Sequence, residues 1–142
     1  MAISNKPQLL SFLTCDNVHV DPGTRKHTLL GLFSGLQAMQ FPMKHPNMFV
    51  FISLTELGEG EHKQRLSLAL PGQEPLVERE QAFKVNSPLQ RVQLINQLQN
   101  VEFPHSGDYD FMLEIDDEPV LVLTFPVREV QLPPGMKTPQ KG

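Results

Sequence analysis

The chain has 142 residues, with 12 basic and 16 acidic side chains, a formal net charge of −4, 13 prolines, one cysteine and no tryptophan. One domain is expected at this length, and the acidic balance argues against a nucleic-acid partner, because such proteins usually carry a basic patch. The lone Cys15 excludes a disulfide framework within the chain and a CxxC-type zinc site, and it is typical of the reducing cytoplasm. A transmembrane helix needs about 20 consecutive apolar residues, which the sequence lacks, so we expect no membrane contact.

Proline limits the length of every predicted element. The longest proline-free stretch covers residues 47–70 and is interrupted by Gly58 and Gly60. Because an interior proline costs a helix about 3 kcal/mol, short strands between turns are favoured. In chain order, the predicted strands cover residues 9–15, 18–20, 29–33, 36–41, 48–55, 64–70, 76–85, 108–116 and 120–130. The run at 48–55 is mostly apolar and predicts a central strand.

The segment 88–101 fits two structures. Ser87 followed by Pro88 is typical of a helix start, and the segment taken alone favours a short helix. It leads directly through residues 102–107 into the clearest strand of the chain. We therefore predict a strand here, with a helix as the alternative.

Residues 108–116 alternate between two kinds of side chain. Tyr109, Phe111, Leu113 and Ile115 form one face, whereas the other face is mostly acidic. Such alternation predicts a strand with one buried face. After a turn at 116–119, residues 120–130 return as a second strand, whose first half is apolar on both sides and is expected to be covered on both faces.

These patterns predict an all-β fold: a single-domain antiparallel β-sandwich of eight or nine strands over residues 1–131, either immunoglobulin-like or jelly-roll. Residues 132–142 contain three prolines and two glycines, and they are predicted to form a disordered tail.

The order of several short motifs carries a family resemblance. Leu-Leu-Ser-Phe-Leu-Thr-Cys-Asp-Asn-Val at 9–18 is followed by Leu-Leu-Gly-Leu-Phe-Ser-Gly-Leu at 29–36, then Phe41-Pro42, 49–51 and 103–111. Over residues 9–130 the chain resembles a functionally uncharacterised family of short bacterial all-β proteins. The resemblance implies a cytosolic, single-domain β-sandwich, and it brings no activity, cofactor or catalytic residue.

Charge is concentrated late in the chain. Between Arg91 and Arg128 there are seven acidic residues and no basic ones. One strand face is predicted to carry the four acidic residues Asp108, Asp110, Glu114 and Asp116. A solvated face that keeps a hairpin soluble explains the pattern, and docking of a basic protein partner is the functional alternative.

A second candidate site lies near the start of the chain. Cys15, Asp16 and His19 are close in sequence, and such side chains can bind a transition metal or support nucleophilic catalysis. A buried, inert thiol at the end of a strand explains Cys15 equally.

The sequence alone does not establish a function. The leading hypothesis is a non-enzymatic interaction or scaffold module in the cytoplasm that binds an unknown protein partner or self-associates through a sheet edge, without a cofactor. The alternative is a small-molecule or metal-binding protein, or an enzyme, with a site near residues 14–16 and the loop histidines.

Overall fold

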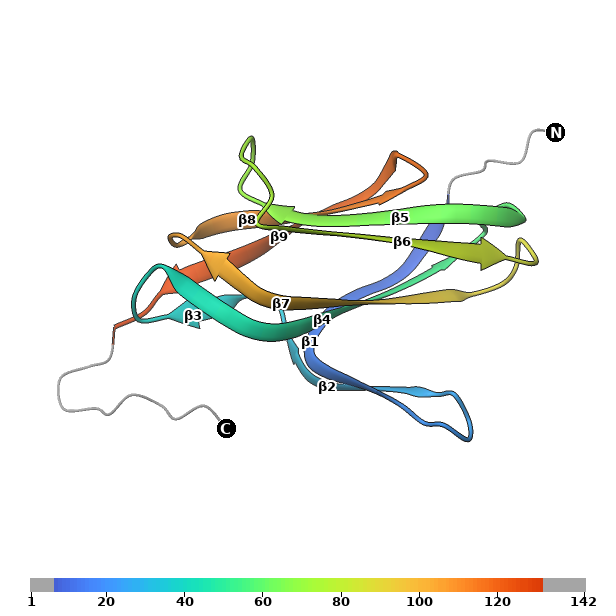
Figure 1. The fold of residues 1–142 in the computed structure, drawn as a ribbon, viewed down its shortest axis with the longest axis horizontal. Helices are drawn as coiled ribbons and strands as arrows, with labels where there is room; N and C mark the ends of the chain where they lie inside the picture. The colour runs from blue at the N-terminus through green and yellow to red at the C-terminus, as the bar shows by residue number, and fades with distance from the viewer. Residues whose placement is uncertain (1–6, 132–142) are drawn as a thin grey trace.

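The computed structural model describes residues 7–131, which form two packed β-sheets (Figure 1). The strands are β1 (Gln8–Val20), β2 (His27–Phe33), β3 (Leu36–Ala38), β4 (Met43–Thr55), β5 (Gly60–Ala69), β6 (Val77–Val85), β7 (Val92–Phe103), β8 (Gly107–Ile115) and β9 (Glu118–Glu129). No helix occurs in this range, and hence none that is long and apolar enough to cross a membrane. The all-β prediction is confirmed, whereas the predicted tail at 132–142 lies outside the described residues.

The two sheets differ in the number and direction of their strands. One sheet has the order β2-β1-β4-β7 and is antiparallel throughout. The other has the order β3-β9-β8-β5-β6 and is antiparallel except for the short parallel pair between β3 and β9. Strand β4 lies in the interior of its sheet, as its apolar sequence predicts.

The core lies between the sheets. Alternation along β8 places Tyr109, Phe111, Leu113 and Ile115 inward, and all four are buried. They pack with inward residues of β4, such as Val50 and Ile52. Because every second residue of each strand faces this layer, the period-2 pattern read from the sequence identifies much of the core.

Residues 92–103 form strand β7, so the strand prediction for this segment is confirmed. The strand pairs with β4 along its whole length, from Met43 opposite Phe103 to Leu54 opposite Val92. Ser87 belongs to a turn instead of a helix start, because its carbonyl accepts a hydrogen bond from the Gln90 amide at 3.0 Å. The tertiary pairing thus overrides the local helix signal.

Strand β1 joins two predicted strands into one of 13 residues that bends strongly near its middle (Figure 1). Its first part pairs with β4, and residues from Thr14 onward pair with β2. Near the bend, Gly31 has a φ of 70° and lies so close to Asp16 that a Cβ atom at this glycine would overlap the carboxylate. A glycine is therefore required there.

The chain crosses from one sheet to the other between β2 and β3. Gly35, at the crossing, approaches β9 so closely that a Cβ atom would lie 2.5 Å from the carbonyl oxygen of Pro126. Strand β3 then pairs with β9 only at residues 127–129. The crossing therefore leaves the rest of that flank of β9 without a neighbouring strand among the described residues.

The first half of β9 does not have the predicted cover on both faces. Val122 is 54% exposed and Leu123 is 42% exposed. Val120 is an extra residue, because Leu113 pairs with Leu121 while Glu114 pairs with Pro119. The apolar sequence of this half reflects an uncovered surface.

Candidate functional site

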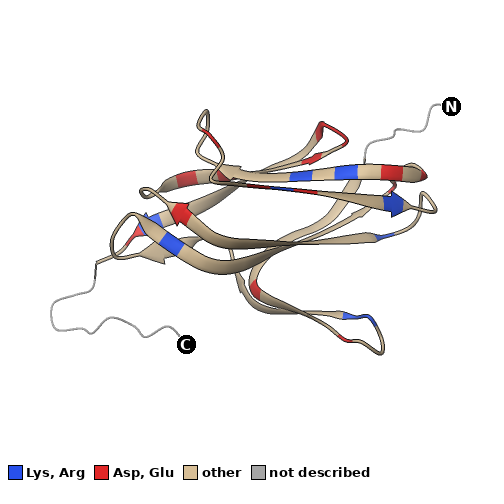
Figure 2. Cartoon of the chain, viewed as in Figure 1, with Lys and Arg blue, Asp and Glu red and all other residues tan. Residues whose placement is uncertain are grey.

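The predicted acidic face occupies the outer surface of β8 and the turn after it. Asp108, Asp110 and Glu114 alternate with the buried residues of β8, and Asp116 lies in the β8–β9 turn with a φ of 53°. Basic residues of β5 lie close to Glu114 and the turn, and Figure 2 shows basic positions on β5, the strand that pairs with β8. The face is therefore a mixed-charge surface.

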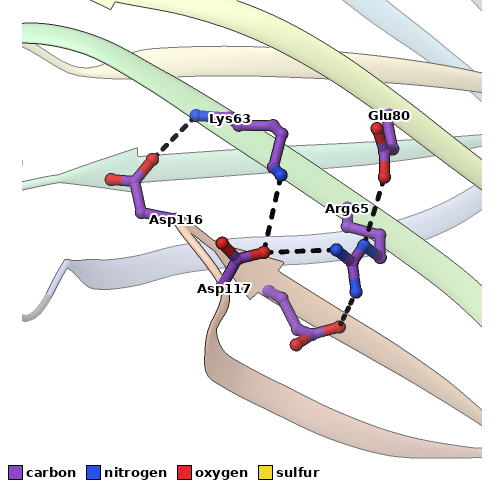
Figure 3. Close-up of polar contacts among 6 residues, drawn as sticks. Lys63, Arg65, Glu80, Asp116 and Asp117 are labelled. Atoms are coloured by element: carbon purple, nitrogen blue, oxygen red, sulfur yellow. Dashed lines mark hydrogen bonds and ion pairs between the residues drawn. The ribbon is translucent and has the colours of Figure 1, made fainter.

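Arg65 of β5 is the centre of an ion-pair network (Figure 3). Its guanidinium lies 3.3 Å from Glu80, 3.4 Å from Glu114 and 3.2 Å from Asp117. The Lys63 ammonium adds a contact of 3.5 Å to the same carboxylate of Asp117. The charge of Glu114 raises the pKa of Arg65, and Glu80 and Asp117 raise it further. Burial lowers this pKa, but by less than Glu114 raises it.

His62 and Asp116 form a second contact at the end of the same network. The ring Nδ1 lies 2.6 Å from the Asp116 carboxylate, and Nε2 lies 2.6 Å from the Gly58 carbonyl oxygen. The ring also stacks on Phe83, with centroids 5.5 Å apart. Burial lowers the pKa of His62, but the hydrogen bonds and the Asp116 charge outweigh it, so the pKa lies above its ordinary value.

Each of the four predicted acidic residues has a partner inside the chain. Asp108 lies 2.5 Å from Arg128, and Asp110 accepts a hydrogen bond of 3.4 Å from Thr124. The charge pattern along the sequence does not reveal the partner of Glu114. Arg65 is distant in the chain, but β5 lies beside β8 in the sheet. Docking of a basic partner on this surface stays a prediction.

Cys15, Asp16 and His19 do not converge. The Cys15 side chain is fully buried and its thiol donates a hydrogen bond of 3.4 Å to the Asn17 carbonyl oxygen, whereas Asp16 is exposed. Burial raises the pKa of Cys15, which reduces its thiolate fraction. Within residues 7–131, no group of three or more His, Cys, Asp or Glu side chains is arranged to hold a metal ion.

A shallow hollow of about 550 Å³ lies where the chain crosses between the sheets. Asp16, Ser34, Gln37 and Arg128 contribute its polar groups, and Gly31 and Gly35 form part of its wall. Arg128 is also engaged by Asp108. Of the alternative site predicted from sequence, only Asp16 reaches this hollow.

Polar side chains close one side of the sandwich, where β6 and β7 meet. Gln64 and Asn96 are buried, and the Asn96 amide donates to the Gln64 carbonyl oxygen at 2.7 Å. Gln81 donates to both of them at 3.1 Å, and the Gln64 amide donates to the Arg79 carbonyl oxygen at 3.2 Å. We call this the sealed side. Its three amides come from three strands, so no local sequence motif reveals them.

The opposite side of the sandwich has a different character. A groove of about 320 Å³ lies between β1 and β2 in one sheet and β8 and β9 in the other. Its lining is mostly apolar and comprises Phe12, Leu13, Thr14, Leu32, Phe33, Ser34, Phe111, Leu123, Thr124 and Phe125. Leu32 is 60% exposed and Leu13 is 38% exposed. We call this the open side.

Both sheets have a free strand edge on the open side. β2 pairs with β1 only from Thr14 onward, so among residues 7–131 the strand neighbour of residues 8–13 is β4 alone. β3 pairs with β9 only at residues 127–129, so residues 118–126 have a strand neighbour only in β8, as far as the described residues extend. Such edges carry backbone groups that can pair with another strand.

The sequence reveals only part of the open side. The pattern predicts that the Leu and Val residues of 9–13 and 120–123 lie in strands, but their exposure depends on where β2 ends and where β3 begins. An apolar strand that remains uncovered cannot be distinguished by pattern from one buried on both faces.

A comparison with protein-family models matches residues 10–128 to a family described as a family of unknown function, DUF6941. The match covers most of the chain, and the chain belongs to this family. No curated protein matches the sequence significantly. The family assignment indicates no activity.

Proposed function

We propose that this member of the DUF6941 family is a protein-interaction module that binds its partner through the open side of the sandwich. The observation that supports the proposal is the coincidence of two free edges with exposed apolar side chains. The free halves of β1 and β9 flank the same groove, and Leu13 and Leu123 line it from the two sheets.

Physical chemistry favours a protein as the occupant of this side. Large exposed apolar patches mark interaction sites in soluble proteins, and an unpaired strand edge offers backbone hydrogen bonds to another strand. Natural sheets usually protect such edges with charged side chains, but residues 8–13 and 119–125 contain none. The bulge at Val120 and the prolines at 119 and 126 interrupt only the ends of the β9 edge.

Site-specific photo-crosslinking tests this proposal. A photoreactive amino acid replaces Leu123 or Leu13 in the full chain, in cells that produce the protein naturally, and crosslinked species are identified by mass spectrometry. Leu89 is the matched control, because it is 81% exposed and lies in the connection between β6 and β7, outside the lining of the groove. We expect a discrete crosslinked protein from Leu123 and Leu13 but none from Leu89. Equal labelling from all three positions, or none, would contradict the proposal.

We also propose a bacterial origin and a cytoplasmic location. The resemblance of residues 9–130 to short bacterial proteins supports the first, and the single buried cysteine is compatible with a reducing compartment. Fractionation of the producing cells tests the location: the chain is expected with cytoplasmic markers, and recovery with secreted or membrane fractions would contradict it.

The hollow beside Asp16 supports small-molecule binding as a second candidate function. Asp16, Ser34, Gln37 and Arg128 are among the residues that line it, and its volume suits a small ligand. Native mass spectrometry of the freshly purified chain tests this candidate. A stoichiometric adduct that is lost in an Asp16→Asn variant would support it, and an adduct-free spectrum would count against it.

A further inference from the structure

This inference rests on the proposed function and names the partner. We infer that the open side binds a second copy of this chain, and that the free half of β1 in each copy pairs with the free half of β9 in the other. Two features carry the inference: the position of the two free edges in different layers, and the absence of charge along both apart from Glu118 at the start of β9.

The two free edges lie on one side of the molecule but in different sheets. β1 is in the β2-β1-β4-β7 sheet and β9 is in the β3-β9-β8-β5-β6 sheet. A single extended peptide can pair with one of these edges and leaves the other free. A partner that closes both needs two layers with a free edge in each.

A second copy of the chain offers two layers with a free strand edge in each. A two-fold axis between the layers, parallel to the strands, exchanges the two sheets and places β1 of each copy beside β9 of the other. Such an interface is self-complementary and closes both edges at once, so it produces a dimer and no further growth. It also buries the exposed leucines at positions 13 and 123 in both copies.

Charge favours the same arrangement. Each chain carries a net charge of −4, yet residues 8–13 and 119–125 are uncharged, so two copies meet on the open side without like charges along the edges. Arg128 and Asp108, at the β3 end of the β9 edge, neutralise each other in an ion pair. The network around Arg65 is centred on β5, two strands away from the β9 edge, and its carboxylates on β6, β8 and the β8–β9 turn are paired with Arg65.

The oligomeric state of the full chain is the first test. Sedimentation equilibrium over a range of micromolar concentrations is expected to give twice the chain mass. Leu13→Glu and Leu123→Lys should each halve that mass, because each places a charge at an edge in both copies of the interface. Leu89→Glu and Leu89→Lys are the matched controls in the β6–β7 connection, away from both free edges, and should leave the dimer intact. Circular dichroism and a cooperative thermal transition establish that each variant is folded.

Mixing the two edge variants identifies the pairing. In the proposed dimer, Glu at position 13 of one copy faces the β9 edge that carries Lys at position 123 of the other copy, while the second β1–β9 contact is of wild-type sequence. Equimolar Leu13→Glu and Leu123→Lys should therefore form a heterodimer, although each alone is monomeric. If β9 paired with β9, the mixture would stay monomeric, and that result would overturn the inference.

The outcomes separate this inference from the proposed function. A wild-type chain that is monomeric at all concentrations overturns the second-copy inference. If the crosslink from Leu123 then joins a different protein, the proposed function stands with another partner. If no position on the open side crosslinks to anything, both fail.

Discussion

The side-chain amide of Asn96 donates a hydrogen bond of 2.7 Å to the side-chain carbonyl of Gln64, and this bond joins the two sheets through the core. Asn96 belongs to β7 in one sheet and Gln64 to β5 in the other. Gln81 of β6 completes the cluster. A buried amide without a partner costs about 1–3 kcal/mol, so the cluster disfavours any sliding of one sheet over the other.

Replacement of Asn96 by Leu should destabilise the protein by about 1–3 kcal/mol, because Gln64 and Gln81 then lose partners in a dry environment. Urea unfolding followed by circular dichroism measures the change. Gln97→Leu is the control: its amide also bonds a side chain across strands, to Asn47 at 2.8 Å, but the contact is exposed. We expect the control to lose much less stability, and equal losses would contradict a special role for the buried cluster.

Gly35→Ala should destabilise the protein by about 1–3 kcal/mol, because the new methyl group would overlap the Pro126 carbonyl oxygen and force β3 away from β9. Gly58→Ala is a matched control, since no atom lies within 4 Å of a Cβ at that position. Thermal unfolding of both variants tests the prediction. An unchanged transition for Gly35→Ala would show that the crossing segment adapts without cost.

Tyr109→Phe should lower the free energy of unfolding by about 1 kcal/mol, and the fold should be retained. The phenol hydroxyl donates a hydrogen bond of 2.6 Å to the His105 carbonyl oxygen, four residues earlier at the entry to β8. Burial raises the pKa of this tyrosine, with the bond to His105 opposing the effect, so the hydroxyl stays protonated and available as a donor. Guanidinium unfolding measures the loss, and a variant as stable as the wild type would indicate that water replaces the bond.

The contribution of His62 to stability should depend on pH. Its folded pKa lies above the ordinary value of about 6.5, so its stabilising effect is complete below that pH and is lost as the pH rises through the folded pKa. The difference in unfolding free energy between the wild type and His62→Gln should therefore shrink from mildly acid to alkaline pH. Asp116→Asn removes the carboxylate that accepts from Nδ1 and should abolish most of this dependence. A difference that grows with pH would contradict the assignment.

Much of the fold could be predicted from the sequence because burial follows a period of two. The alternation at 108–116 identified the buried residues of β8, and even the ambiguous segment before it was assigned to a strand. The sequence did not reveal where strands end relative to their neighbours. Whether the β9 edge at Val122 has a neighbouring strand depends on β3 starting only at Leu36, opposite Val127, and the partner of Glu114 depends on which strand lies beside β8.

The position of β4 between β1 and β7 has a consequence for folding. Its register joins Gln8 to Thr55 on one flank and Met43 to Phe103 on the other, so both neighbours are distant in the chain. Loop closure must precede these contacts, and such topologies fold in milliseconds to seconds. During synthesis, the apolar β4 has one flank unpaired until β7 leaves the ribosome. A newly made chain is therefore exposed to aggregation or chaperone capture until most of it has been translated.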